Sequence, residues 1–268
     1  STRAAQPPHD HAVVPGVYYV DDASAVGDLY TPCAGADGND ANAGTSPLAP
    51  KRTLTNLLST YDIGPGNWIY IDTGVHAYPV IVNPADADGT PGAPIRFVGP
   101  TNGAIADFTG SAMHAGFFLT NATSVRFIFL RVRGYTNGIE FRGGSTNCYI
   151  YGNNIRSNVN RAVYLHGPDV DANFVMSNTI RGLPGASVGV VVMDGDRNLV
   201  SRNIASRHSN DAIRLGGDAS MNIIRSNTVF SNGIRGILVD IGSDAADDNE
   251  IVRNTIYGPG QTIGIEVV

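Results

Sequence analysis

Residues 222–239 read NIIRSNTVFSNGIRGILV, and other parts of the chain repeat this pattern. Four clear copies are NCYIYGNNIRSNVNRAVYL (147–165), NFVMSNTIRGLPGASVGVVV (173–192), NLVSRNIASRHSNDAIRL (198–215) and NEIVRNTIYGPGQTIGIEV (249–267). A more degenerate copy, SVRFIFLRVRGYTNGIEF, covers residues 124–141. The second Asn of the copies recurs as Asn153, Asn178, Asn203, Asn227 and Asn254, at intervals of 24 to 27 residues. A repeat of this length predicts a solenoid, in which each coil contacts mainly its neighbours.

The composition narrows the class of protein further. The chain has 268 residues with 32 Gly, only 16% charged residues and a net charge of −6. Few charges together with many Gly, Asn, Val and Ile are typical of a turn-rich β protein. The net negative charge does not indicate a basic surface that binds nucleic acid. No apolar run is long enough for a transmembrane helix, and the leader STRAAQPPHDHAVVPG has no apolar signal segment.

The segment before the repeats predicts a short strand, a loop and a helix. The strand is VYYVDD (17–22) and the loop is GADGNDANAGTSPLAP (35–50). In KRTLTNLLSTYDIG (51–64), apolar residues have the spacing of one helix face; they are Leu54, Leu57, Leu58 and Tyr61. Because the end coil of a solenoid needs a cover, we expect a helix that caps the N-terminal coil. The predicted organisation is a leader, loop and capping helix (1–66), continuous with a β-solenoid (67–268).

The loop holds four oxygen-bearing side chains within six residues, Asp37, Asn39, Asp40 and Asn42. Two interpretations stay open for them. They could bind a structural calcium ion, which prefers such oxygen ligands. The favoured interpretation is an ordinary loop of Asx turns.

The N-terminal segments carry a family resemblance. The order VYYVDD, GNDANAGTSPLAPKRTLTNLL, GPGNWIYIDTGVHAY and GTPGAPIRFVG resembles the N-terminal signature of right-handed parallel β-helix proteins related to bacterial polysaccharide lyases. With the repeats, the resemblance covers nearly the whole chain. It implies an all-β, right-handed parallel β-helix of about eight coils, three short strands in each coil, and a polysaccharide bound along one outer sheet. It also implies a secreted, cell-surface or periplasmic bacterial protein whose signal segment was removed.

Each coil of such a helix has predictable inner and outer positions. Stacked strands lie about 4.8 Å apart, so equal residues at equal positions form columns along the axis. The second-Asn column can link amide to amide, because each amide donates and accepts, and it is predicted to be structural. A further structural column comprises Asn173, Asn198, Asn222 and Asn249.

Alternation in the third strand of each coil places one set of residues inward: Ile139, Val163, Val190, Ile213, Ile237 and Ile265, followed by Phe141, Leu165, Val192, Leu215, Val239 and Val267. A column of small residues is then expected outside: Gly138, Ala162, Gly189, Ala212, Gly236 and Gly264. Two interpretations of this column are equally favoured. It is either a floor on which a sugar chain lies, or it merely permits the bend after the long turn.

Polar and aromatic residues of the middle coils form the candidate active site. Cleavage of a uronate by β-elimination needs a cation for the carboxylate, a base for the carbon-bound proton and an acid for the leaving oxygen. We predict a catalytic set of His166, Tyr164 and Arg214, with His166 and Tyr164 transferring protons. The predicted substrate-binding set is Glu140, Arg142, Arg161, His208, Asp211, Arg235 and Asp240.

The resemblance does not carry over one known mechanism. Some related lyases use a Lys base beside calcium, but the single Lys of this chain, Lys51, lies in the cap region. An Arg base, as in pectate-lyase-like relatives, stays open through Arg214 or Arg235. The alternatives to a lyase are a glycoside hydrolase that uses Asp211 and Asp240 on adjacent coils, and a non-catalytic glycan-binding or scaffold protein.

Two expectations concern covalent structure and the chain end. Cys33 and Cys148 form a disulfide or stay as two free thiols, the latter being favoured. The chain stops at IEVV within an expected outer strand, which leaves an unpaired sheet edge. We therefore expect further chain or another subunit to cover that end.

Overall fold

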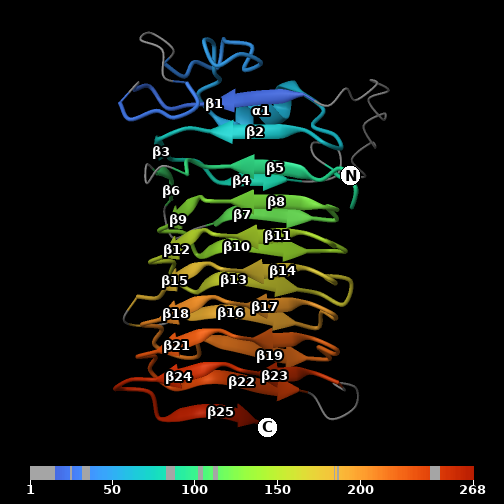
Figure 1. Cartoon of the computed structure of the whole chain (residues 1–268), viewed down its shortest axis with the longest axis vertical. Helices are drawn as coiled ribbons and strands as arrows, with labels where there is room; N and C mark the ends of the chain where they lie inside the picture. Colours follow the sequence, from blue (N-terminus) through green and yellow to red (C-terminus); the bar gives the residue numbers. More distant parts are fainter. Residues whose placement is uncertain are drawn as a thin grey trace, which may run out of the picture.

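Three parallel sheets run along the molecule in the computed structural model (Figure 1). The structure describes residues 16–24, 26–31, 37–82, 88–101, 105–110, 114–183, 185, 187–241 and 248–268. Within these ranges the chain forms twenty-five strands and one helix, α1 (Leu54–Thr60). Successive strands of a coil belong to different sheets, so the chain winds as a solenoid. The parallel β-solenoid expected from the repeats is confirmed.

We name the sheets by the place of their strands in the coil. The first sheet has the order β1 (Val17–Val20), β2 (Trp68–Ile71), β5 (Ile95–Val98), β8 (Val125–Ile128), β11 (Tyr149–Tyr151), β14 (Phe174–Met176), β17 (Leu199–Ser201), β20 (Ile223–Arg225), β23 (Glu250–Val252). The second has β3 (Gly74–His76), β6 (Ala106–Thr109), β9 (Arg131–Arg133), β12 (Asn154–Arg156), β15 (Thr179–Arg181), β18 (Ile204–Ser206), β21 (Thr228–Phe230), β24 (Thr255–Tyr257). The third has β4 (Val80–Val82), β7 (Ala115–Thr120), β10 (Asn137–Arg142), β13 (Arg161–His166), β16 (Val188–Met193), β19 (Ile213–Gly217), β22 (Arg235–Ile241), β25 (Ile263–Val267).

The core fills the space between the sheets with one or two apolar side chains from almost every strand. The inward positions predicted for the third strand are buried from β10 to β22, as in Ile139, Val190 and Ile237. In β25 the same positions are open, because Ile265 is 48% and Val267 is 68% exposed. A cover over this end by further chain or another subunit stays a prediction.

Asparagine side chains hold the bends of neighbouring coils together. At the bend between the first and second sheets, Asn153 Nδ2 donates to Asn178 Oδ1 (3.1 Å), and Asn178 Nδ2 donates to Asn203 Oδ1 (3.0 Å). The ladder continues through Asn227 to Asn254. The residue before each ladder Asn has a positive φ, for example Ser177 at 57°. The predicted structural role of this column is confirmed, and the column of Asn173, Asn198, Asn222 and Asn249 forms a comparable ladder.

A third column, which the sequence comparison did not single out, lies at the bend between the second and third sheets. Asn158 Oδ1 accepts from Tyr135 N (3.1 Å), and Asn232 Oδ1 accepts from His208 N (3.1 Å). Both Asn side chains are buried. Each of the three corners of the coil therefore has its own set of buried side-chain hydrogen bonds.

The small residues of the third strand, apart from Gly264 in the last coil, face the bend and not the solvent. A Cβ on Gly138 would lie 2.5 Å from Ala162 O and 2.8 Å from Asn158 Nδ2. A Cβ on Gly189 would lie 2.2 Å from Ala212 O. Ala162 and Ala212 themselves belong to the buried core. The expected outer floor for a sugar is thus wrong, and these residues instead permit the close approach of coils at the bend.

The N-terminal end is capped as expected. Leu54, Leu57 and Leu58 of α1 are buried and join the core cluster of the first coils, and α1 lies beside β1 at this end of the molecule (Figure 1). Thr53 is the N-cap and accepts from Asn56 N. Since β1 pairs with β2 in the first sheet, the cap and the solenoid share one sheet and one core.

The polar loop before α1 uses its side chains for local structure. Asp40 accepts from Thr53 N (2.9 Å), Asn39 accepts from Ala41 N (2.9 Å), and Asn42 donates to Pro50 O (2.9 Å). The Lys51 ammonium donates to the carbonyl oxygens of Asp40 (3.0 Å) and Asn42 (2.8 Å). It takes the place that a cation bound to these carbonyls would need. Calcium binding by Asp37, Asn39, Asp40 and Asn42 stays a prediction.

Cys148 occupies the top of the second Asn column as a free, buried thiol. Its Sγ accepts from Val125 N (3.4 Å), and its backbone N donates to Asn173 Oδ1 (2.9 Å). Burial raises the pKa of this thiol to about 12. Cys33 and the leader (1–15) lie outside the described residues.

Candidate active site on the third sheet

The outer face of the third sheet brings together only part of the predicted site. The register pairs Glu140 with Tyr164 and Arg142 with His166 on adjacent strands. Tyr164 pairs with Val191, and Val191 pairs with Arg214. Arg214 is therefore two strands from Tyr164, about 10 Å along the axis. The structure groups Tyr164 and His166 with Arg142 and Arg161, and not with Arg214.

We call Arg161, Tyr164, His166 and Asp194 the β13 cluster. The rings of Tyr164 and His166 stack with centroids 5.0 Å apart and an interplanar angle of 14°. On the other side, Arg161 Cζ lies 4.1 Å from the Tyr164 ring centroid. His166 Nδ1 lies 3.9 Å from Asp194 Oδ2, in the loop after the next strand. Tyr164 is only 8% exposed, whereas the His166 side chain is 37% exposed, so His166 is the more accessible group.

The hydrogen-bonding capacity of this cluster is largely unused by the protein. His166 Nδ1 is buried and has no hydrogen-bond partner within the described part of the chain. Among the described residues, no carboxylate forms an ion pair with Arg161. A guanidinium without a carboxylate partner is available to bind one from a ligand. The cluster thus offers a free cation beside two groups that can transfer protons.

Glu140 and Arg142 form a fixed pair next to the cluster. The Glu140 carboxylate is buried and accepts from Asn137 Nδ2 (2.7 Å) and from Arg142 Nε. The Arg142 guanidinium also lies over the Phe118 ring, 5.7 Å from its centroid. Because Glu140 neutralises it, Arg142 is a weaker partner for a substrate carboxylate than Arg161.

The arginines further along the sheet are occupied by carboxylates. Arg214 is ion-paired with Asp240, and Arg235 is ion-paired with Asp211 (3.2 Å) and with Glu266. The hydrogen bonds that Arg235 donates to Glu266 and Asp211 raise the pKa of Arg235. A general base needs a neutral form that is reachable near the working pH, and a raised pKa opposes this. This disfavours Arg235 as a base, and the ion pair with Asp240 already occupies the Arg214 guanidinium.

His208 does not face the groove, so the prediction that it binds substrate there is wrong. Its ring is buried at the bend in the third column, with Nδ1 3.4 Å from Ser187 Oγ. Burial lowers its pKa to about 4. A neutral, buried ring between two coils is a packing element of the bend.

The carboxylate pair of the hydrolase alternative is too far apart. The register pairs Asp240 with Gly216, and Asp211 precedes Gly216 by five residues. Within this stretch only residues 213–216 are strand, and their three steps alone span about 10 Å, whereas paired catalytic carboxylates lie about 5 to 9.5 Å apart. Each carboxylate is also held by a different arginine. Asp211 and Asp240 therefore do not form a hydrolytic pair.

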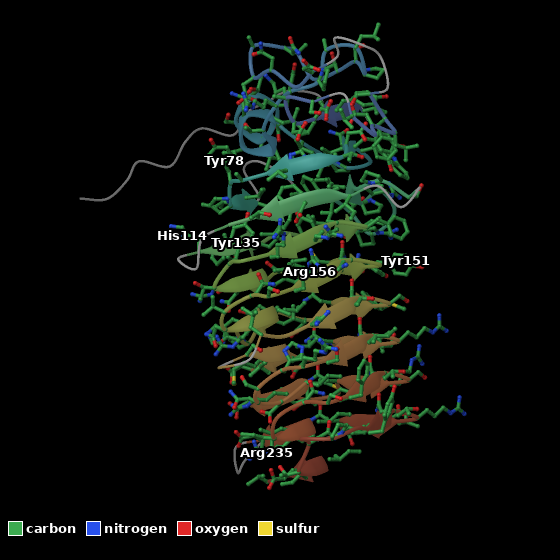
Figure 2. The ribbon with its side chains drawn as sticks, turned by 90° about the vertical axis from the view of Figure 1, so that its left-hand side faces the viewer. Tyr78, His114, Tyr135, Tyr151, Arg156 and Arg235 are labelled. Carbon is green, nitrogen blue, oxygen red and sulfur yellow. The ribbon has the colours of Figure 1, made fainter. Side chains whose placement is uncertain are left out.

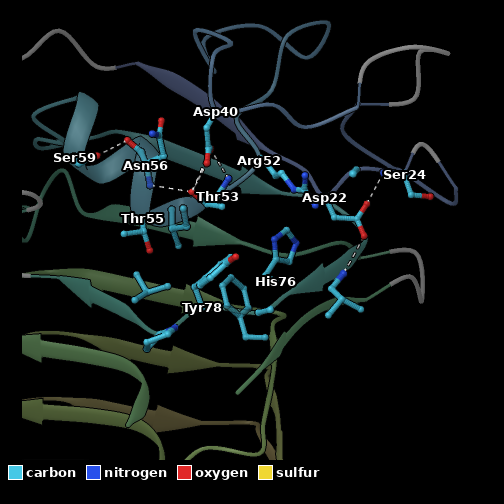
Figure 3. A pocket seen from close by; sticks show the side chains of 17 residues that line it. Asp22, Ser24, Asp40, Arg52, Thr53, Thr55, Asn56, Ser59, His76 and Tyr78 are labelled. Carbon is cyan, nitrogen blue, oxygen red and sulfur yellow. Dashed lines mark hydrogen bonds between the residues drawn. The ribbon is translucent and has the colours of Figure 1, made fainter. Parts of the chain in front are cut away.

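A hollow of about 980 Å³ lies elsewhere, between α1 and the first coil (Figure 3). Several of its polar residues are used in structure. Asp22 accepts from Ser24 N and Val75 N, and Asp40 accepts from the N-cap Thr53. His76 stacks on Phe108 and contacts Asp72 O (3.2 Å), and burial lowers its pKa. The hollow is a seam between cap and solenoid, in which Asp22, Asp40 and His76 make structural contacts.

Sequence reasoning missed Asp194 as a member of the site. The residue lies in the sequence DGD (194–196), in an acidic loop that follows the third strand. The signal was available, since a loop residue directly after Met193 must lie near His166 on the adjacent strand. Within the described ranges, no group of three or more His, Cys, Asp or Glu is placed to hold a metal ion.

Comparison with known proteins assigns the family. The sequence of residues 115–266 matches the family model of the right-handed β-helix region. The match covers more than half of the 268 residues, so the chain belongs to the family of right-handed β-helix proteins. No curated protein sequence matches. No helix in the described part of the chain is long and apolar enough to cross a membrane.

Several solved structures share the fold. The pectate lyase Pel9A aligns with a TM-score of 0.60 and 14% identity, over 92% of this chain and 79% of that chain. A rhamnogalacturonan lyase aligns with a TM-score of 0.58 and 15% identity, over 94% and 67% of the two chains. The A-module of the mannuronan C-5 epimerase AlgE4 from Azotobacter vinelandii gives 0.50 and 16%, over 75% and 65%. At such identities the likeness concerns the fold alone.

Proposed function

We propose that this protein cleaves a uronate-containing polysaccharide by β-elimination at the β13 cluster. The observation that supports the proposal most is the stack of Arg161, Tyr164 and His166 on one face of one strand. The names of the structural neighbours, two of them lyases and one a uronate epimerase, agree with this chemistry. Such polymers occur outside the cytoplasm, and we expect the protein to act there.

Each group of the cluster has a role in the proposed reaction. The Arg161 guanidinium binds the sugar carboxylate and stabilises the negative charge that develops when the neighbouring carbon loses its proton. The His166 imidazole accepts that proton, and the electron pair forms a carbon–carbon double bond. The bond to the glycosidic oxygen breaks, and the Tyr164 hydroxyl donates a proton to this oxygen. Asp194 stabilises the imidazolium that forms.

The shared face of Tyr164 and His166 restricts the substrate. Both side chains project from the outer face of β13, so they reach a sugar from the same side. They fit a sugar whose acidic proton and leaving oxygen lie on the same side of the ring. Mannuronate and glucuronate have this arrangement, whereas in galacturonate the two groups are on opposite sides. We therefore propose mannuronate or glucuronate chains as the substrates.

The test is incubation of the protein with polymannuronate, a glucuronate polymer, polygalacturonate and a neutral glucan, with added calcium or EDTA. We expect ultraviolet absorbance of the unsaturated uronate to rise together with reducing ends for one of the first two polymers. Reducing ends without absorbance would indicate a hydrolase. No product from any polymer would indicate a protein that binds glycans without cleaving them. Preference for polygalacturonate would contradict the same-side geometry.

Variants then separate the roles. Because proton transfer by a positioned side chain contributes about 10²–10⁴ in rate, His166→Ala and Tyr164→Phe should lower kcat by such a factor with little change in KM. Arg161→Gln should raise KM and also lower kcat. Arg214→Gln is the matched control, because Arg214 lies outside the cluster, and it should retain most of the activity. Full activity of His166→Ala would contradict the assignment of His166 as the base.

A further inference from the structure

A line of arginines crosses the outer face of the second sheet, away from the β13 cluster. The register places Arg133, Arg156 and Arg181 directly beside one another on β9, β12 and β15. Arg131 lies next to this line, at the start of β9. Figure 2 looks onto this face, with Arg156 near its middle. Neighbouring guanidinium groups therefore emerge from strands about 4.8 Å apart.

Among the described residues, only two of these four arginines pair with a carboxylate, and both pair with Asp107. Asp107 accepts from Arg133 Nε (3.0 Å) and lies 3.5 Å from Arg131 Nη1. Within the described residues, Arg156 and Arg181 form no ion pair. Burial and then the neighbouring guanidinium groups lower the pKa of Arg156. Like charges directly opposite each other destabilise a sheet, so this concentration of positive charge, on a protein with a net charge of −6, needs a reason outside folding.

The same line continues into aromatic residues. Arg181 pairs with Ser206, Ser206 with Phe230, and Phe230 with Tyr257. The rings of Phe230 and Tyr257 stack with centroids 5.4 Å apart and an interplanar angle of 13°, and Tyr257 is 54% exposed. Flat aromatic faces offer apolar surface to the C–H faces of sugar rings. We call the line from Arg133 to Tyr257 the second-sheet column; it crosses six strands and is about 24 Å long.

We propose that the second-sheet column is a binding site for an anionic polysaccharide that carries a carboxylate on each sugar and lies along the solenoid axis. Arg133, Arg156 and Arg181 bind successive carboxylates, and Phe230 and Tyr257 stack against the next sugars. One sugar residue of an extended chain is about as long as one strand spacing of about 4.8 Å, so the periods match. The site lies on a different sheet from the β13 cluster and does not depend on the proposed lyase activity.

The test measures the Kd of polymannuronate and polygalacturonate by calorimetry, using the full chain with His166→Ala so that no polymer is cleaved. Each arginine lost removes a charge-assisted hydrogen bond, so Arg156→Gln together with Arg181→Gln should weaken binding by about a hundredfold. Phe230→Ala with Tyr257→Ala should also weaken it, and the parent affinity should fall with added salt. Removing like charges should keep or raise the Tm, which shows that the arginine variant is folded.

The matched control is Arg202→Gln with Arg225→Gln, two exposed arginines away from the column, which changes the net charge equally. It should leave the Kd unchanged. An equal loss of binding in this control would mean that the net charge alone explains the effect, and it would overturn the proposal. Unchanged binding in the arginine double variant of the column would overturn it as well. Equal affinity for single-stranded oligo-dT would also overturn it, since nucleic acid can use arginines and stacked rings in the same way. If variants of the β13 cluster lose polymer cleavage but still bind the polymer, the result bears on the proposed lyase activity and not on the second-sheet column.

Discussion

His208 lies at the bend where other coils place Asn158 and Asn232. Its backbone N donates to Asn232 Oδ1 (3.1 Å), as Tyr135 N donates to Asn158 Oδ1 (3.1 Å). Its ring Nδ1 lies 3.4 Å from Ser187 Oγ. An imidazole at this position has a consequence that an amide lacks, because it can gain a proton. Burial without a carboxylate partner lowers its pKa from 6.5 to about 4. The residue thus links the packing of two coils to pH.

His208→Asn should make the protein less sensitive to acid. Since the pKa of the folded state lies below that of the unfolded state, the unfolded chain binds the proton first as the pH falls. The stabilising contribution is complete above about pH 6.5 and is lost towards pH 4, on the order of 3 kcal/mol in total. In urea unfolding at several pH values, the variant should be slightly less stable at pH 7 but lose less stability on acidification. His114→Asn, an exposed position, is the control. Equal acid sensitivity of His208→Asn and the parent would contradict the prediction.

At the scale of the element, the Asn ladder is the feature that joins one coil to the next. Asn178 accepts from Asn153 N (2.9 Å) and donates to Ile150 O (2.8 Å) and to the next ladder amide. Asn178→Ala leaves these buried groups without partners, so the free energy of unfolding should fall by about 2–4 kcal/mol. Thr179→Ala, at the exposed next residue, should cost much less. Denaturant unfolding of both variants checks this, and similar losses for the two would argue against the ladder as a stabilising element.

The strands show what a sequence pattern reveals and what it hides. Alternation predicted the inward residues of the third strand, because the side-chain period of a strand is fixed. It failed for Gly138 and Ala162, since the coil bends there, turning Gly138 towards Asn158 and placing Ala162 in the core. The arginines of the second sheet were readable as RVR, NIR and TIR in successive repeats. They are missing from the predicted site because that site was confined to the third strand of each coil and its flanking turns.

For the whole molecule, the repeat predicted the solenoid, the cap and the order of strands well. The site was predicted less well, because its residues are set by pairing of side chains and not by their place in the repeat. Arg214 and Tyr164 share one face of the sheet but are two strands apart. Arg214 is in addition ion-paired with Asp240. Likewise Asp211 and Asp240 lie on adjacent coils yet at opposite ends of their strands. Position along the strand decides such distances, and spacing between coils alone does not.

The one-dimensional architecture predicts how damage to the cap spreads. Leu57 is fully buried in α1, and Leu57→Ala should cost about 2–5 kcal/mol by leaving a cavity against the first coils. Because each coil contacts mainly its neighbours, the loss should stay local. Native-state hydrogen exchange should show amides of β1, β2 and β5 losing protection, while β14 to β20 keep theirs. Leu48→Ala, at a position 63% exposed, should change neither region. Uniform loss of protection along the solenoid would mean instead that the cap and all coils unfold as one cooperative unit.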